Sequence, residues 1–200
     1  MQRLLIDKTN CKIISLAEEF INQSKKNVFW ITGQTGYGKT AIVNYLIAKS
    51  VEKNQRVCPL TSEDLIKLLV EAARSCYPGD WMLSHFKEYD LLVFDNIDLF
   101  LNHKPHTQES VKGLLQEILE GGKTKIILAT SMSPDKFKKL RFKRNEIYIA
   151  RLKKPTIDFK VKLLKQYIQK NKISVSPEII RHTAKETDNL FQLKGAFHSL

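Results

Sequence analysis

Residues 33–40 read Gly-Gln-Thr-Gly-Tyr-Gly-Lys-Thr, and this segment restricts the fold more than any other feature of the sequence. An apolar run, Asn27–Thr32, precedes it, and a helical pattern, Lys39–Val51, begins at its end. A glycine-rich turn between a buried strand and a helix lets successive backbone N–H groups face a phosphate at the positive end of the helix. The spacing therefore predicts a phosphate-binding loop on a parallel α/β sheet.

The side chains of this loop indicate which ligand it binds. Lys39 is expected to reach the β and γ phosphates of a nucleotide, and Thr40 is expected to bind Mg²⁺. The predicted cofactors are therefore ATP or ADP and Mg²⁺. The loop does not identify the reaction, because kinases, GTPases, motors and loaders share it. The residues expected to bind the nucleotide are Gly33, Thr35, Gly36, Tyr37, Gly38, Lys39, Thr40 and Ala41.

The rest of the chain predicts a three-layer α/β fold followed by helices. Continuous apolar runs favour strands covered on both faces, and their alternation with helical patterns favours a mainly parallel sheet. These runs are Arg56–Leu60, Leu91–Phe94, Lys125–Ala129 and Glu146–Leu152, and the helical patterns are Ser62–Cys76 and Gln108–Glu120, with Ser62 and Thr107 as expected caps. After Pro155 we expect only helices, near Ile157–Gln169, Pro177–Lys185 with Ser176 as cap, and Leu190–Leu200. We therefore predict a nucleotide-binding α/β domain over 1–154 and a small helical lid over 155–200.

Two further strand ends carry candidate catalytic residues. Asp95 follows Leu91–Phe94 and is expected to bind the same Mg²⁺ as Thr40. Asn96 occupies the next position, where many hydrolysing enzymes of this class have an acid; since an amide cannot accept the proton, any ATPase activity is expected to be weak or partner-stimulated. Thr130 and Ser131 follow the apolar run Lys125–Ala129. Either one of them faces the γ-phosphate or its attacking water, or the two hydroxyls simply cap the strand end.

Charge is unevenly distributed along the chain. Residues 1–122 carry 14 basic and 15 acidic side chains, whereas residues 123–200 carry 19 and 6, a net charge of +13. Nine of the basic residues lie between Lys136 and Lys154. Such a run forms either a solvated face or a contact with the phosphate backbone of single-stranded or non-specific DNA.

Nothing in the sequence suggests secretion or a membrane span. No apolar run approaches the 18 or so residues that a spanning helix needs, and the first twenty residues lack a signal peptide's apolar stretch. Three cysteines without metal-ligand spacing are typical of reduced thiols. We therefore expect a cytoplasmic protein without a membrane partner.

The motifs taken in order resemble one family. They are Thr61–Leu65, Phe94–Asp98, Thr107–Glu109, Ile118–Thr124 and Asp188–Phe197. With the phosphate loop they resemble the AAA+ module of the bacterial DnaA and Hda replication proteins, over essentially the whole chain. The resemblance implies an ATP-binding domain with a helical lid. It also implies a role in initiating or regulating DNA replication, through nucleotide-dependent assembly with DnaA or another AAA+ subunit.

The chain departs from the family's pattern at two places. The lid arginine that senses nucleotide in the family aligns with Phe191, so this contact with the phosphates is expected to be lost. The arginine-finger segment maps onto residues 141–144, where Arg141, Lys143 or Arg144 takes the slot and Arg144 is our choice. The family's DNA-binding helix-turn-helix does not follow the lid, so sequence-specific origin recognition is not expected.

Two partner assignments and two alternative functions remain open. In DnaA-like proteins the region corresponding to residues 65–86 holds single-stranded DNA. The segment Gln2–Ile6 resembles the sliding-clamp peptide of Hda, but it aligns equally well with the first strand of the module. A helicase-loader or transposition-helper ATPase is an alternative function, which stable binding to a replicative helicase would indicate. A non-hydrolysing nucleotide-binding interaction module is another, which would assemble equally with ATP and ADP.

Overall fold

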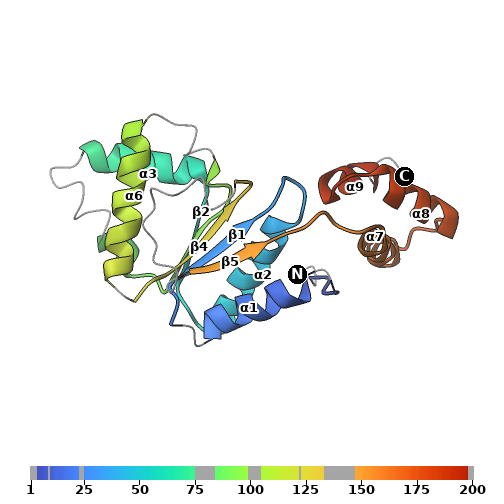
Figure 1. The fold of residues 1–200 in the computed structure, drawn as a ribbon, viewed down its shortest axis with the longest axis horizontal. Helices are drawn as coiled ribbons and strands as arrows, with labels where there is room; N and C mark the ends of the chain where they lie inside the picture. Colours follow the sequence, from blue (N-terminus) through green and yellow to red (C-terminus); the bar gives the residue numbers. More distant parts are fainter. Residues whose placement is uncertain are drawn as a thin grey trace.

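The described strands and helices alternate from α1 to β4. The computed structural model describes residues 4–8, 10–22, 25–74, 84–98, 105–121, 123–132 and 147–197. The elements, drawn in Figure 1, are α1 Cys11–Asn22, β1 Val28–Thr32, α2 Lys39–Val51, β2 Val57–Leu60, α3 Ser62–Arg74, β3 Leu91–Phe94, α6 Pro105–Glu120, β4 Lys125–Thr130, β5 Ile147–Arg151, α7 Ile157–Asn171, α8 Pro177–Glu186 and α9 Leu190–Phe197. The five strands expected from the sequence are confirmed to within a residue at each end.

The sheet has the strand order β2-β3-β4-β1-β5, and every neighbouring pair is parallel. The register aligns the last residue of β1, Thr32, with the last residue of β4, Thr130. Likewise Phe94, which ends β3, lies opposite Leu128 of β4. Because the carboxyl ends of parallel strands meet at one edge, the segments that follow β1, β3 and β4 lie together there.

The central strands β1, β3 and β4 are buried on both faces, as their continuous apolar runs predict. Alternate residues of a strand point to opposite faces, so Val28 and Trp30 belong to one hydrophobic cluster while Phe29 and Ile31 belong to another. All four side chains are at most 1% exposed. Such burial stabilises the fold by roughly 1.5–3 kcal/mol for each large apolar side chain.

Helices cover the two faces and complete three layers. Leu65 of α3 and Leu115 of α6 pack in the cluster that contains Val28, whereas Phe20 of α1 and Leu46 of α2 pack in the other. Figure 1 shows the pair α3 and α6 on one side of the sheet and the pair α1 and α2 on the other. The predicted three-layer α/β architecture is therefore confirmed.

The last three helices pack around a core of their own. It contains Leu164 of α7, Ile180 and Ala184 of α8, and Leu193 of α9. Ser176 caps α8, as expected, because its hydroxyl accepts a hydrogen bond from the backbone N–H of Ile179. We call α7–α9 the lid; the boundary between residues 154 and 155 stays a prediction.

Two predicted helix caps are wrong. The hydroxyl of Thr61 accepts from the backbone N–H of Asp64 at 3.2 Å, and the Asp64 carboxylate accepts from the N–H of Thr61 at 3.0 Å. This reciprocal pair is a capping box, so Thr61 rather than Ser62 caps α3. Thr107 lies inside α6, which begins at Pro105 because the fixed φ of proline suits a first helical turn.

Helix α1 is not among the helices predicted from the sequence. Its buried side chains, Ile14, Ala17, Phe20 and Ile21, recur at the spacing of one helical face. The signal was therefore present in the sequence. The described residues Leu4–Ile6 form no strand, so the alternative in which they begin the sheet is wrong for that part of the segment. Within the described ranges, no helix is both long and apolar enough to cross a membrane.

Candidate nucleotide-binding site

The predicted phosphate loop connects β1 to α2. Two of its glycines have left-handed backbone angles, with φ of 80° at Gly36 and 96° at Gly38. Other residue types are strained in this region, so both positions require glycine. Helix α2 begins at Lys39 without a side chain capping its first N–H groups. Its N-terminus therefore retains the donors and positive dipole end that bind phosphate.

Lys39 lies within the loop that precedes it. Its ammonium donates to the backbone carbonyls of Gly33 at 2.7 Å and Gln34 at 3.2 Å. Burial lowers the pKa of Lys39, and the carboxylates of Asp98 and Asp95 partly offset this effect. The loop thus holds a cation close to its own phosphate-binding N–H groups.

Thr40 and Asp95 come together as predicted. The Thr40 hydroxyl donates to the Asp95 carboxylate at 2.9 Å, joining the first turn of α2 to the end of β3. Both groups supply oxygen atoms, which are the ligands that Mg²⁺ prefers. This pair fits the magnesium of a nucleotide.

A second carboxylate, Asp98, occupies the same edge of the sheet. It accepts hydrogen bonds from the hydroxyl of Thr130 and, at 2.8 Å, from the backbone N–H of Ser131. The Thr130 oxygen in turn accepts from the backbone N–H of Met132 at 3.0 Å. Thr130 is fully buried, and its side chain bonds the segment after β3 to the end of β4.

The ends of β1 and β4 are also bonded to each other. The Thr32 hydroxyl donates to the carbonyl of Met132 at 2.6 Å, and the backbone N–H of Gly33 donates to the carbonyl of Thr130 at 3.3 Å. The start of the phosphate loop is therefore tied to the strand that carries Thr130.

Asn96 has a left-handed conformation, with φ of 60°, and an exposed side chain. Asparagine tolerates this region better than most residues. The backbone carbonyl of Asn96 accepts a hydrogen bond from the hydroxyl of Ser62 at 2.7 Å. This bond explains why Ser62 is buried instead of capping its own helix.

The lid contacts the phosphate loop through the turn before α9. The backbone N–H of Leu190 donates to the carbonyl of Gly36 at 2.9 Å. A Cβ at Gly36 would lie only 2.7 Å from the side-chain oxygen of Asn189, so the contact is close. The Lys154 ammonium bonds Asp188 at 2.7 Å, which raises the pKa of Lys154 and lowers that of Asp188.

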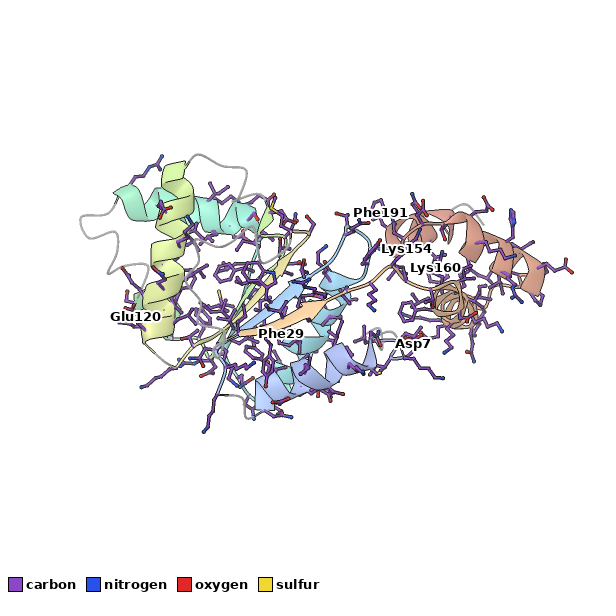
Figure 2. All side chains as sticks on the ribbon, viewed as in Figure 1. Asp7, Phe29, Glu120, Lys154, Lys160 and Phe191 are labelled. Carbon is purple, nitrogen blue, oxygen red and sulfur yellow. The ribbon has the colours of Figure 1, made fainter. Side chains whose placement is uncertain are left out.

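Two lid side chains near this turn differ sharply in exposure. Phe191 lies at the end of α9 nearer the sheet and is 75% exposed (Figure 2). Lys160 is buried, and its ammonium donates to the carbonyl of Thr187 at the start of the same turn. Burial, together with the charge of Lys154, lowers the pKa of Lys160. Phe191, which takes the position of the family's lid arginine, thus has no cationic group that could bind a phosphate.

The predicted site residues divide into three groups. The loop residues, Asp95, Asn96 and Thr130 meet at one edge of the sheet, with Tyr37 bonded through its hydroxyl to Gln34 at 2.8 Å. Thr35 of the loop and Ala41 of α2 are exposed. Arg144 lies outside the described residues, as do Arg141 and Lys143. Asp98 is the residue that the predicted site lacked, although a carboxylate three positions after Asp95 was a visible signal.

The chain has a parallel sheet with a phosphate loop after β1, an acid after β3 and a hydroxyl at the end of β4, followed by a helical lid. These features define an AAA+ ATPase module. The sequence model of the bacterial DnaA ATPase domain matches residues 5–150. The chain belongs to this family.

Individual relatives agree with the family assignment. The chromosomal replication initiator protein DnaA of Helicobacter acinonychis is 27% identical over 169 residues, 82% of this chain and 37% of the relative. The chain therefore spans little more than a third of the curated relatives that it matches.

Solved structures show the same fold. Domain III of the Thermotoga maritima replication initiation protein DnaA superimposes with a TM-score of 0.80 at 22% identity, covering 97% of this chain and 83% of that one. A replication initiator DnaA bound to AMPPCP and single-stranded DNA gives 0.78 at 19% identity, covering 96% and 61%.

Proposed function

We propose that this chain binds ATP or ADP together with Mg²⁺ and assembles with a partner ATPase, DnaA or another AAA+ subunit, in the initiation or regulation of bacterial DNA replication. The observation that carries the proposal is the meeting of Lys39, Thr40 and Asp95 at one edge of the sheet. A cation, a hydroxyl and a carboxylate beside a helix N-terminus are the groups that hold a magnesium nucleotide.

The residues present fit this ligand. Thr40 and Asp95 would hold the Mg²⁺, which neutralises phosphate charge, while the N–H groups of the loop and of α2 would hold the phosphates. Lys39 would exchange the carbonyls of Gly33 and Gln34 for phosphate oxygens.

Hydrolysis by the chain alone is expected to be slow. Asn96 cannot accept a proton from water, and Phe191 cannot replace a phosphate-binding arginine. We therefore propose that bound nucleotide acts chiefly through assembly. An arginine finger at Arg144, supplied to a neighbouring subunit, is part of this proposal.

The relatives of this chain support the class of partner. The curated relatives are chromosomal replication initiators, and a structural neighbour was solved with AMPPCP and single-stranded DNA. Those ligands belong to that protein; for this chain, DNA contact through residues 136–154 is a proposal. A Hda-like regulatory role, sliding-clamp binding through residues 2–6 and a cytoplasmic location also remain proposals.

Sedimentation of the purified protein tests the assembly. The protein is run with ADP or a non-hydrolysable ATP analogue, each with and without DnaA. We expect co-sedimentation with DnaA that depends on the ATP analogue, and its loss in Lys39→Ala but not in Lys53→Ala, since Lys53 is an exposed lysine beyond the end of α2.

Other outcomes separate the alternatives. Equal assembly with ADP and the ATP analogue would favour a non-hydrolysing interaction module, for which Asn96 and Phe191 are the specific observations. No complex with DnaA in either state, together with a stable complex with a replicative helicase, would favour a helicase loader.

A further inference from the structure

Thr130 ends β4 beside the phosphate loop, and its hydroxyl has only one hydrogen to donate. That hydrogen is directed to the Asp98 carboxylate, while one lone pair of the oxygen accepts from the backbone N–H of Met132. A hydroxyl has one donor and two acceptor sites. In this arrangement Thr130 therefore has one acceptor site left and no donor.

The Asp98 carboxylate is fixed from two sides. Its second oxygen accepts from the backbone N–H of Ser131 at 2.8 Å, so it cannot turn away from Thr130 without leaving that group unpaired. Met132 is itself fixed, because its carbonyl accepts from the hydroxyl of Thr32 at the end of β1. The orientation of the Thr130 hydroxyl is thus set by the ends of three elements.

Asp98 also places negative charge near the predicted phosphates. Of the two carboxylates that raise the pKa of Lys39, Asp98 has the larger effect and Asp95 the smaller. Lys39 is the side chain expected to reach the β and γ phosphates. The Asp98 charge is therefore felt where a terminal phosphate would lie.

We propose that Asp98 is a positioning residue that holds the Thr130 hydroxyl in its buried position, where it cannot donate to a terminal phosphate, while the charge of Asp98 opposes that phosphate. The proposal rests on the proposed function, because it concerns the nucleotide held by the same loop. It predicts that Asp98 controls the ratio of the affinities for ATP and ADP. The two nucleotides differ by the γ-phosphate alone.

The variant Asp98→Asn tests this assignment by reversing the hydrogen bond. The introduced carbonyl oxygen can still accept from the N–H of Ser131, which leaves the introduced NH₂ group facing Thr130. This group would donate to the Thr130 oxygen and free the hydroxyl hydrogen for a phosphate. We expect the ATP affinity to rise about tenfold, or about 1.4 kcal/mol, relative to the ADP affinity, because the γ-phosphate gains one hydrogen bond from a neutral donor.

Two further variants separate the hydroxyl from the charge. Thr130→Val keeps the shape of the side chain and removes the hydroxyl, and we expect the ATP/ADP affinity ratio to stay within about twofold of the parent protein. In the double variant the effect of Asp98→Asn should shrink to the part due to charge. Asp90→Asn is the matched control, because it removes one carboxylate at the opposite end of β3, where Asp90 accepts from the backbone N–H of Arg56 at 2.8 Å.

The measurement is equilibrium binding of fluorescent ATP and ADP analogues in the presence of Mg²⁺, with circular dichroism to check that each variant folds. A roughly tenfold loss of ATP affinity alone in Thr130→Val would overturn the proposal, because the hydroxyl would then be donating to the γ-phosphate. An unchanged ratio in Asp98→Asn would overturn it as well. If Asp98→Asn does not fold, Thr130→Val still decides the matter. If the parent protein binds neither nucleotide, the proposed function itself fails, an outcome distinct from binding with the wrong ratio.

Discussion

At the scale of single residues, the candidate site depends on groups with more than one partner available to them. Lys39 bonds two carbonyls of its own loop, and Thr40 bonds Asp95, so both side chains are ordered before any phosphate is present. Ordering them in advance lowers the entropy that binding would cost. The site is therefore arranged for a magnesium nucleotide by hydrogen bonds within the chain.

Replacing Lys39 with alanine tests this arrangement directly. We expect Lys39→Ala to lower the affinity for ATP by about 100-fold, because charged hydrogen bonds to two phosphates, of about 1.5–3 kcal/mol each, are lost and partly replaced by water. Titration with a fluorescent ATP analogue measures the change. Lys53→Ala should bind like the parent protein; unchanged affinity in Lys39→Ala would contradict the site.

The sequence predicts the site residues that lie at the ends of strands. Asp95 and Thr130 follow recognisable apolar runs, and parallel strands bring such ends together. The role of Asp98 could not be predicted in the same way. It depends on a turn in which Asn96 has a positive φ and Asp98 meets the backbone of Ser131, contacts that strand patterns do not encode.

At the scale of elements, the same limits apply to helices. The buried strands were predictable because their apolar runs are continuous. The cap of α3 differs from the predicted one because Thr61 and Ser62 are both good capping residues. Only the Asp64 carboxylate and the bond of buried Ser62 to Asn96 distinguish them. Helix α1 shows its apolar face only when read at helical spacing.

Helix α1 is bonded to α2 through a side-chain pair that can be titrated. The Tyr45 hydroxyl of α2 donates to the Glu18 carboxylate of α1. Burial, followed by the bond and the charge of Glu18, raises the pKa of Tyr45 to about 12. The neutral phenol is therefore favoured in the folded protein. The stability from this pair should be complete below pH 10 and be lost as the pH rises from about 10 to about 12.

Ultraviolet titration of tyrosinate absorbance measures this shift. We expect a tyrosine to ionise near pH 12, and Tyr45→Phe to remove this late step. Tyr167→Phe, a change within the lid, is the control and should leave it in place. If the late step were lost in Tyr167→Phe and kept in Tyr45→Phe, its assignment to Tyr45 would be wrong.

At the scale of the whole molecule, the change in net charge along the chain falls close to the start of β4. The near-neutral residues 1–122 form most of the sheet, and the +13 segment begins just before β4 and includes the lid. Not every basic side chain in it is free to bind DNA, because Lys154 is paired with Asp188. Lys153 is exposed, and Arg151 is exposed but has an interaction within the chain. The remaining members of the 136–154 run lie outside the described residues.

DNA binding by this segment has a measurable salt dependence. Each phosphate of a single strand that is neutralised contributes about −0.7 to the slope of log affinity against log salt concentration. If Lys143 and Arg144 each contact one phosphate, replacing both with alanine should weaken single-strand binding and make the slope less negative by about 1.4. Fluorescence anisotropy of a labelled oligonucleotide at several salt concentrations gives both quantities. Replacing the exposed Lys170 and Lys172, near the end of α7, with alanine removes the same charge elsewhere. An equal change in this control would show that net charge, and not the 136–154 segment, determines the affinity.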